Sequence, residues 1–375
     1  MNVDFIIVGG GVAGLSAAYN LSKIGKVVVL EREESIGYHS SGRSASLFHL
    51  GIGNSKVKSL TYYSNEFFQN PGESFSEIPL TSPSSLLLVV RPGQEELIES
   101  ELPKIREFSP KASIVDIEGI SKLVPVISKD HSDINIGIFD ESAYRLDAHA
   151  LLQGYSKGIK KNGGLITNNA NVNNISQSGS TWQVQTEDTE YVASILINAA
   201  GAWGDELAKM ANVEPIGLSP LKRTLISFDP PEDSQIENWP FVRSLAEEFY
   251  FLPESGRILA SPADETPITA CDAQPDEYDI ALAAYRIEEM TSMAVKHIHH
   301  KWSGLRTFSP DRVPVAGFDD KKSGFFWLVG QGGYGFQTAP AMADITSSLI
   351  SGADFPTRLF DMGITTNDVS PSRFR

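Results

Sequence analysis

The chain has 375 residues, of which 41% are hydrophobic and 21% are charged, and this length exceeds one ordinary domain and predicts two. Its 31 basic and 47 acidic residues give a net charge of −16, which would repel nucleic acid and anionic membrane surfaces. The single cysteine, Cys271, excludes an internal disulfide and a zinc site built on several thiolates, and we expect no metal. Without a signal-like or transmembrane segment, we expect a cytoplasmic protein.

The N-terminal residues predict a βαβ unit. Residues 4–8 form a short β-branched run, typical of a strand buried on both faces, and the run stops at three glycines. A helical pattern follows over residues 12–23, and a second apolar strand over residues 27–30. Strand, helix and strand together form one βαβ unit within about 30 residues.

The middle of the chain has a different pattern. Beyond residue 54, short strand patterns are separated by Pro, Gly and Ser, which predicts a mixed, largely antiparallel sheet. The first pattern returns near the C-terminus, where a strand, a glycine turn (331–335) and a helix (338–351) follow one another. We therefore expect two interleaved domains. The remaining predicted elements are strands at 84–90, 113–117, 134–139, 194–199, 249–252 and 324–329, and helices at 95–108 and 147–161.

The strongest local motif is Gly9-x-Gly11-x-x-Gly14, which follows the first strand and opens the first helix. Glycines let the backbone approach a pyrophosphate, and the helix N-terminus then faces that anion. Glu31, at the end of the second strand, is placed to accept hydrogen bonds from a ribose diol and disfavours a 2′-phosphate. The motif predicts a dinucleotide site.

Three further segments decide which dinucleotide. The loop GYHSSGRSA (37–45), the strand end INAAGAW (197–203) and the segment GLRTFSPDRVP (304–314) together resemble the D-amino-acid oxidase family of FAD-dependent amine oxidoreductases. The resemblance runs nearly end to end. Within the family, the spacing from residue 38 to the turn at 331–335 is most similar to bacterial D-amino-acid dehydrogenases that act on D-arginine.

The resemblance implies an α/β fold (α+β overall), with a Rossmann-like FAD-binding domain interleaved with a substrate-binding domain on a mixed, largely antiparallel sheet. It also implies non-covalent FAD, because the loop that carries a tethering cysteine in some relatives has none here. The predicted FAD-binding domain comprises 1–80, 145–218 and 302–375, and the substrate-binding domain 81–144 and 219–301. The residues implied to bind FAD are Gly9, Gly11, Gly14, Glu31, Arg32, Arg43, Ser44, Ala45, Gly201, Trp203, Gly332, Gly333, Tyr334 and Gly335.

Arg223, Tyr250 and Arg306 match the family's carboxylate-binding positions. A guanidinium can hold an α-carboxylate bidentately and so aim the Cα–H bond at the flavin. The resemblance therefore implies oxidative deamination of D-amino acids to 2-oxo acids and ammonia, by hydride transfer to flavin N5.

The expected side-chain pocket departs from the arginine-specific pattern. Ser85 stands where that pattern has an acid, and Leu47 and Ile52 replace polar or aromatic groups. Because a cationic side chain would be buried without a partner, we expect a neutral or apolar substrate side chain. His49 could face the same pocket, although a buried structural role is the more common one for such a histidine.

The same residues are compatible with other functions. Arg306 would also suit a glycine, sarcosine or other secondary-amine oxidase, or a 2-hydroxy-acid oxidoreductase. A non-catalytic dinucleotide-binding sensor is an alternative of another class, against which the carboxylate-binding residues argue. The sequence indicates neither the electron acceptor nor the oligomeric state.

Overall fold

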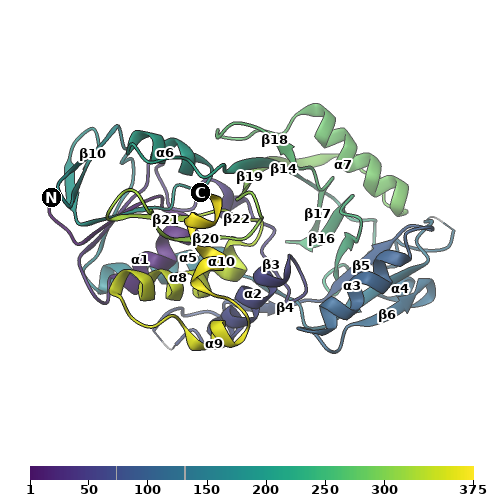
Figure 1. Ribbon diagram of the computed structural model, residues 1–375. Helices are drawn as coiled ribbons and strands as arrows, with labels where there is room; N and C mark the ends of the chain where they lie inside the picture. Colours follow the sequence, from purple (N-terminus) through teal and green to yellow (C-terminus); the bar gives the residue numbers. More distant parts are fainter. Residues whose placement is uncertain (73, 131) are drawn as a thin grey trace.

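Two large sheets divide the fold, which the computed structural model describes for residues 1–72, 74–130 and 132–375 (Figure 1). The first sheet has six strands in the order β20-β21-β13-β1-β2-β9, parallel except for the edge strand β20. This is the predicted Rossmann-like layer. Its strands are β1 (Phe5–Val8), β2 (Val27–Leu30), β9 (Leu165–Thr167), β13 (Ile195–Asn198), β20 (Val315–Phe318) and β21 (Phe325–Val329).

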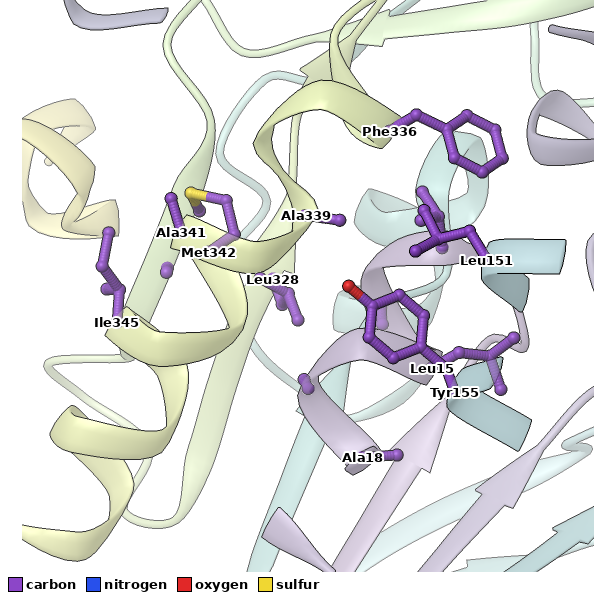
Figure 2. Close-up of a cluster of buried hydrophobic side chains, with 14 of the residues drawn as sticks. Leu15, Ala18, Leu151, Tyr155, Leu328, Phe336, Ala339, Ala341, Met342 and Ile345 are labelled. Atoms are coloured by element: carbon purple, nitrogen blue, oxygen red, sulfur yellow. The ribbon is translucent and has the colours of Figure 1, made fainter. Parts of the chain in front are cut away.

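Both faces of the six-stranded sheet are covered, which explains the uninterrupted apolar run of β1. Phe5 and Ile7 join a core formed with three helices, whereas Ile6 and Val8 join a core on the opposite face. Figure 2 shows the first core, where Leu15, Tyr155 and Met342 from the three helices meet Leu328 of the sheet. The helices are α1 (Val12–Leu21), α5 (Ala148–Lys161) and α8 (Gly335–Ser351).

A small antiparallel sheet closes the opposite face. Trp182 lies fully buried there and packs against Phe325 of β21, with ring centroids 5.7 Å apart. The elements on this side are β10 (Asn174–Ser178), β11 (Thr181–Gln185), β12 (Glu190–Ala193) and α6 (Gly204–Met210).

The second large sheet has ten strands, drawn on the right in Figure 1, and is mixed and mostly antiparallel as predicted. Its order is β22-β19-β14-β17-β16-β15-β5-β7-β6, with β18 paired to β14. Three helices lie along it, α3 (Glu96–Arg106), α4 (Ile117–Leu123) and α7 (Glu277–Met290). The strands are β5 (Leu86–Val90), β6 (Ser113–Asp116), β7 (Ile136–Asp140), β14 (Ser219–Phe228), β15 (Phe241–Ser244), β16 (Tyr250–Glu254), β17 (Arg257–Ser261), β18 (Thr266–Pro267), β19 (Ile298–Phe308) and β22 (Gln331–Gly332).

The chain crosses between the two large sheets several times, as the interleaved pattern predicts. The first sheet takes strands from both ends of the chain and from its middle, and the second sheet takes those between, with β22 added from the C-terminal part. The predicted domain boundaries themselves stay a prediction. The remaining elements are β3 (Leu47–Phe48), β4 (Thr81–Pro83) and β8 (Tyr144–Leu146), which form a three-stranded sheet, and α2 (Ser55–Gln69), α9 (Thr357–Asp361) and α10 (Thr366–Val369).

A buried hydrogen bond joins the three-stranded sheet to the ten-stranded sheet. His49, just after β3, and Asp140, at the end of β7, are almost completely buried, and Nε2 of the histidine donates to Oδ2 of the aspartate over 2.8 Å. Nδ1 accepts the Gly51 N–H (3.0 Å), which fixes the proton on Nε2. Burial alone would raise the pKa of Asp140, but hydrogen bonds from His49, Ser109 and the Ser142 N–H outweigh it and hold that pKa below its usual range. His49 is therefore a structural residue.

Candidate active site

A cavity of about 580 Å³ extends from the glycine loop at β1 to the ten-stranded sheet. It brings together most of the residues predicted from the sequence, although they come from both large sheets. Gly14 and Ser85 are the two predicted residues that do not line it. The predicted residues that do are Gly9, Gly11, Glu31, Arg32, Arg43, Ser44, Ala45, Leu47, Ile52, Gly201, Trp203, Arg223, Tyr250, Arg306, Gly332, Gly333, Tyr334 and Gly335.

The three glycines of the motif have different structural roles. Gly9 has a φ of +114°, and a Cβ there would lie 2.3 Å from the carbonyl oxygen of Ala199. A Cβ on Gly14 would lie 2.0 Å from the carbonyl oxygen of Gly9, so this glycine lets helix α1 pack closely against β1. At Gly11 a Cβ would meet only the Ser41 hydroxyl, at 3.3 Å, so its missing side chain leaves space in the cavity.

Glu31 is held rigidly at the same end of the cavity. Its buried carboxylate accepts the backbone N–H of Gly10 over 2.8 Å and that of Glu33 over 2.9 Å. Each oxygen keeps further lone pairs, so the carboxylate can still accept hydrogen bonds from a diol. This geometry matches the role that the motif predicts.

Arg32 and Trp203 stack on each other and form one side wall of the cavity. The Arg32 guanidinium lies 3.8 Å from the centre of the Trp203 ring, and the ring of His39 lies 4.6 Å from it. His39 in turn forms a 2.8 Å hydrogen bond with Glu33. Stacking of this kind fixes the indole beside the cavity.

Arg43 is fully engaged with protein groups. Its guanidinium donates to the carbonyl oxygens of Ala273 (3.0 Å) and Ser303 (2.7 Å), and it forms an ion pair with Asp272. Arg43 therefore ties the loop 37–45 to β19 and to the segment before α7. Ser44 lies next to it, and its hydroxyl accepts the Ser46 N–H over 3.0 Å.

The glycine turn at 331–335 carries an arginine against its backbone. A Cβ on Gly333 would lie 2.0 Å from Nη2 of Arg306, so a side chain at this position would displace the guanidinium. Gly332 has a φ of +54° and is packed under Phe308. The turn leads directly into α8, whose positive N-terminal end faces the cavity.

The arginines predicted to hold a carboxylate already share one. Glu265 Oε1 accepts from Nη1 of Arg306 (3.1 Å) and from Nη2 of Arg223 (3.4 Å), and Arg312 adds contacts of 2.9 and 3.0 Å. Burial, and then the charge of Arg223, lower the pKa of Arg306 to about 10, so Arg306 is still charged at neutral pH. Sequence reasoning missed Glu265. The acidic pair Asp264-Glu265 after a strand was the available signal, but its arginine partners are distant in sequence.

Beside these arginines, the cavity wall on the ten-stranded sheet is apolar and aromatic. Phe241 stacks on Tyr250 with ring centroids 5.2 Å apart, and Leu225 lies in the same cavity wall. Arg243, which sequence reasoning also missed, stands directly opposite Tyr250 in the β15–β16 pair. Leu47 and Ile52 line this cavity as predicted, whereas Ser85 lines a neighbouring one and is not brought together with them.

Buried polar groups without partners in the cavity wall fit a bound dinucleotide. Among residues 1–72, 74–130 and 132–375, buried side-chain atoms without a hydrogen-bond partner include Thr307 Oγ1 and Gln331 Nε2, and both residues line this cavity. Unpaired buried groups are costly, so they indicate a polar ligand. Together with the glycine loop and the fixed Glu31, they are suited to FAD.

Two other sequence features lie elsewhere. Cys271 is exposed and does not line the cavity, and His299 forms a 2.7 Å hydrogen bond with Asp229 at the far end of β19. Within the described part of the chain, no helix combines the length and apolar character that crossing a bilayer requires.

Known proteins are similar to this chain over most of its length. The chain is 24% identical to rat mitochondrial dimethylglycine dehydrogenase over 96% of its own length, but it spans less than half (44%) of that protein. It is 27% identical to glycine oxidase of Pseudomonas putida, with 94% of this chain and 96% of the relative covered.

Among solved structures, L-proline dehydrogenase from P. horikoshii superposes over the whole chain and 98% of its own, with a TM-score of 0.85 at 19% identity. This likeness shows the fold. The family described as FAD dependent oxidoreductase (DAO) matches residues 4–349. The chain therefore belongs to the DAO family of FAD-dependent oxidoreductases.

Proposed function

We propose that this protein oxidises the C–N bond of a small amino acid whose carboxylate is held by Arg306 and Arg223. The observation that carries this proposal is the position of these two arginines and Tyr250 in the cavity that also contains the glycine loop. A guanidinium pair at one end of a dinucleotide cavity would place a bound amino acid beside the redox cofactor.

The chemistry divides between cofactor and protein. When bound, FAD supplies the acceptor for the hydride that leaves Cα. Arg306 and Arg223 would bind and orient the carboxylate through charge-assisted hydrogen bonds, with Glu265 giving up part of its contacts to the substrate. Leu225, Phe241 and Tyr250 would keep water from the reacting carbon.

The proton of the amine is left to solvent in this proposal. The carboxylates that line the cavity, Glu31 and Glu206, belong to its glycine-loop half, and His39 lies beside Trp203. A neutral amine therefore enters the reaction, and the imino product of a primary amine is hydrolysed in water to a 2-oxo acid and ammonia.

We propose two candidate substrates. The sequence resemblance favours a D-amino acid with a neutral side chain, with D-arginine disfavoured. The relatives named dimethylglycine dehydrogenase and glycine oxidase favour a second candidate, glycine or an N-methylated glycine. Both candidates need the same carboxylate grip.

An anaerobic titration of the purified flavoprotein tests the proposal. The yellow flavin spectrum is expected to bleach with at least one member of a panel of D- and L-amino acids, glycine, sarcosine and dimethylglycine. Bleaching by 2-hydroxy acids alone would contradict amine oxidation. A spectrum unchanged by every amine would favour the non-catalytic sensor instead.

The same preparation tests how the cofactor is held. Acid denaturation is expected to release intact FAD, because Cys271 lies outside the cavity. Flavin that stays on the denatured chain would contradict non-covalent binding, and His39, a nucleophile that lines the cavity, would then be the residue to replace.

A further inference from the structure

The substrate end of the cavity has one arginine beyond the pair that shares Glu265. Three arginines line it, Arg223 on β14, Arg243 on β15 and Arg306 on β19. The carboxylates of the lining, Glu31 and Glu206, are at the other end, beside β2 and in α6. Glu265 and Glu247, the acids that pair with these arginines, do not line the cavity, so the guanidinium groups are the charges that face a ligand at this end.

The register of the sheet aims Arg243 into the same space as Tyr250. The two residues are directly opposite in the antiparallel β15–β16 pair, so their side chains project from one face. Phe241, two residues before Arg243 on the same strand, projects from that face too and stacks on Tyr250. Arg243 therefore stands at the edge of the aromatic wall.

Tyr250 separates Arg243 from the arginines that hold the first carboxylate. The Arg223 guanidinium lies 5.9 Å from the centre of the Tyr250 ring, on the β14 side. In the sheet order β14-β17-β16-β15, three strand steps of about 4.8 Å place the backbones of β14 and β15 roughly 14 Å apart. Arg243 is thus suited to bind the end of a small molecule opposite to the end held by Arg223 and Arg306.

The partner of Arg243 is exchangeable. Nη2 donates to Glu247 over 2.5 Å, but Glu247 lies four residues along in a turn, and its side chain is 55% exposed. Because Glu247 is exposed to solvent, its ion pair with Arg243 is expected to contribute little to stability. Arg223 and Arg306, in contrast, share the less exposed Glu265.

We propose that Arg243 binds a second carboxylate, and that the preferred substrate is therefore an amino or imino dicarboxylate rather than a neutral amino acid. This inference rests on the proposed function, since the first carboxylate is the one held by Arg306 and Arg223. The apolar carbons between the two acids would lie on Leu225, Phe241 and Tyr250. A guanidinium substrate side chain would meet Arg243 and be repelled, so D-arginine stays disfavoured.

Binding without turnover tests the inference directly. Glutarate carries two carboxylates and no amine, and butyrate carries one, so neither needs to be oxidised. Titration calorimetry of the flavoprotein is expected to give at least ~10-fold tighter binding for glutarate, and Arg243→Gln is expected to remove most of that difference. Arg257→Gln, an arginine on β17 outside the cavity, is the matched control and is expected to leave the difference intact.

Turnover gives the second readout. The ratio of kcat/KM for glutamate to that for glutamine, taken with the preferred enantiomer, is expected to fall at least ~10-fold in Arg243→Gln, mainly through KM. Arg243→Lys is expected to restore part of the ratio. Iminodiacetate and sarcosine form the corresponding pair for a secondary amine.

The outcomes separate this inference from the proposed function. Equal glutarate and butyrate affinities, or a preference for glutamine or sarcosine that Arg243→Gln leaves unchanged, would overturn the dicarboxylate while amine oxidation stands. Tight glutarate binding that depends on Arg243, with a flavin that no amine reduces, would support the anion site and overturn the proposed oxidation.

Discussion

The two ends of the cavity recognise their ligands by different means. At the glycine-loop end, backbone groups and the missing side chain of Gly11 make the site, and a single carboxylate, Glu31, is fixed by two backbone N–H groups. At the other end, arginine side chains from separate strands make the site, and Glu265 neutralises part of their charge. The first end is built for one cofactor, whereas side-chain changes at the second can alter the substrate without rebuilding the fold.

The largest expected effects come from the glycine loop. Gly11→Leu is expected to fold and to lose FAD completely, because a side chain there meets only Ser41 in the protein and extends into the cavity. Gly14→Leu is expected to fail to fold, because its Cβ would overlap the Gly9 carbonyl.

Circular dichroism and the flavin-to-protein absorbance ratio separate the two glycine variants. A Gly11→Leu protein with normal flavin content would show that the loop does not hold the cofactor. A soluble, flavin-loaded Gly14→Leu protein would contradict the packing role of that glycine.

The next effect belongs to the arginine end. Arg306→Met is expected to lower kcat/KM at least ~10²-fold, about 2.7 kcal/mol, because a charge-assisted contact to the substrate carboxylate is lost. FAD content is expected to stay normal, since we expect the cofactor's phosphates and ribose to bind at the glycine-loop end. Wild-type kinetics in this variant would mean that the carboxylate is held elsewhere.

An intermediate effect on stability is expected from the buried hydrogen bond between His49 and Asp140. Asp140→Asn is expected to cost about 2 kcal/mol at neutral pH, because His49 loses its charged acceptor. The folded pKa of Asp140 lies below its unfolded value, so this contribution is present above about pH 4 and is lost as pH falls further.

Thermal unfolding of the wild type and Asp140→Asn from pH 3 to pH 7 measures that contribution. The gap in Tm is expected to narrow toward pH 3. An equal gap at every pH would show that the charge of Asp140 is not what stabilises the fold.

The smallest effect is expected at Ser85. Because Ser85 lines the neighbouring cavity, Ser85→Glu is expected to change the relative kcat/KM of neutral and cationic amino acids by less than about 2-fold. A strong shift toward D-arginine would show that Ser85 faces the substrate pocket, as the sequence predicts. The rates for D-arginine and D-leucine give the comparison.

Sequence reasoning succeeded where the signal is local. The glycine motif, the two buried strands and the helix between them are close together in sequence, so residues 4–31 alone predicted the βαβ unit that the structure shows. Helix α2 was missed because its few buried apolar residues, such as Leu60 and Phe68, are spread among polar ones.

The arginine end could be predicted only in part. Arg223, Tyr250 and Arg306 came from the family resemblance, and all three line the cavity. Arg243 and Glu265 depend on which strands are neighbours in the ten-stranded sheet, and one chain's sequence does not specify that order. Ser85, just before β5, lines a neighbouring cavity, and its role in the substrate pocket stays a prediction.

Rapid-mixing flavin reduction tests whether the arginine pair holds the substrate's carboxylate. The rate is measured with the best amino acid found and with the corresponding amine that lacks the carboxylate, in wild type and in Arg306→Met. Removing the carboxylate is expected to slow flavin reduction at least ~10²-fold in wild type and much less in the variant, because the two changes delete one interaction. Equal slowing in both proteins would show that Arg306 and the carboxylate do not interact.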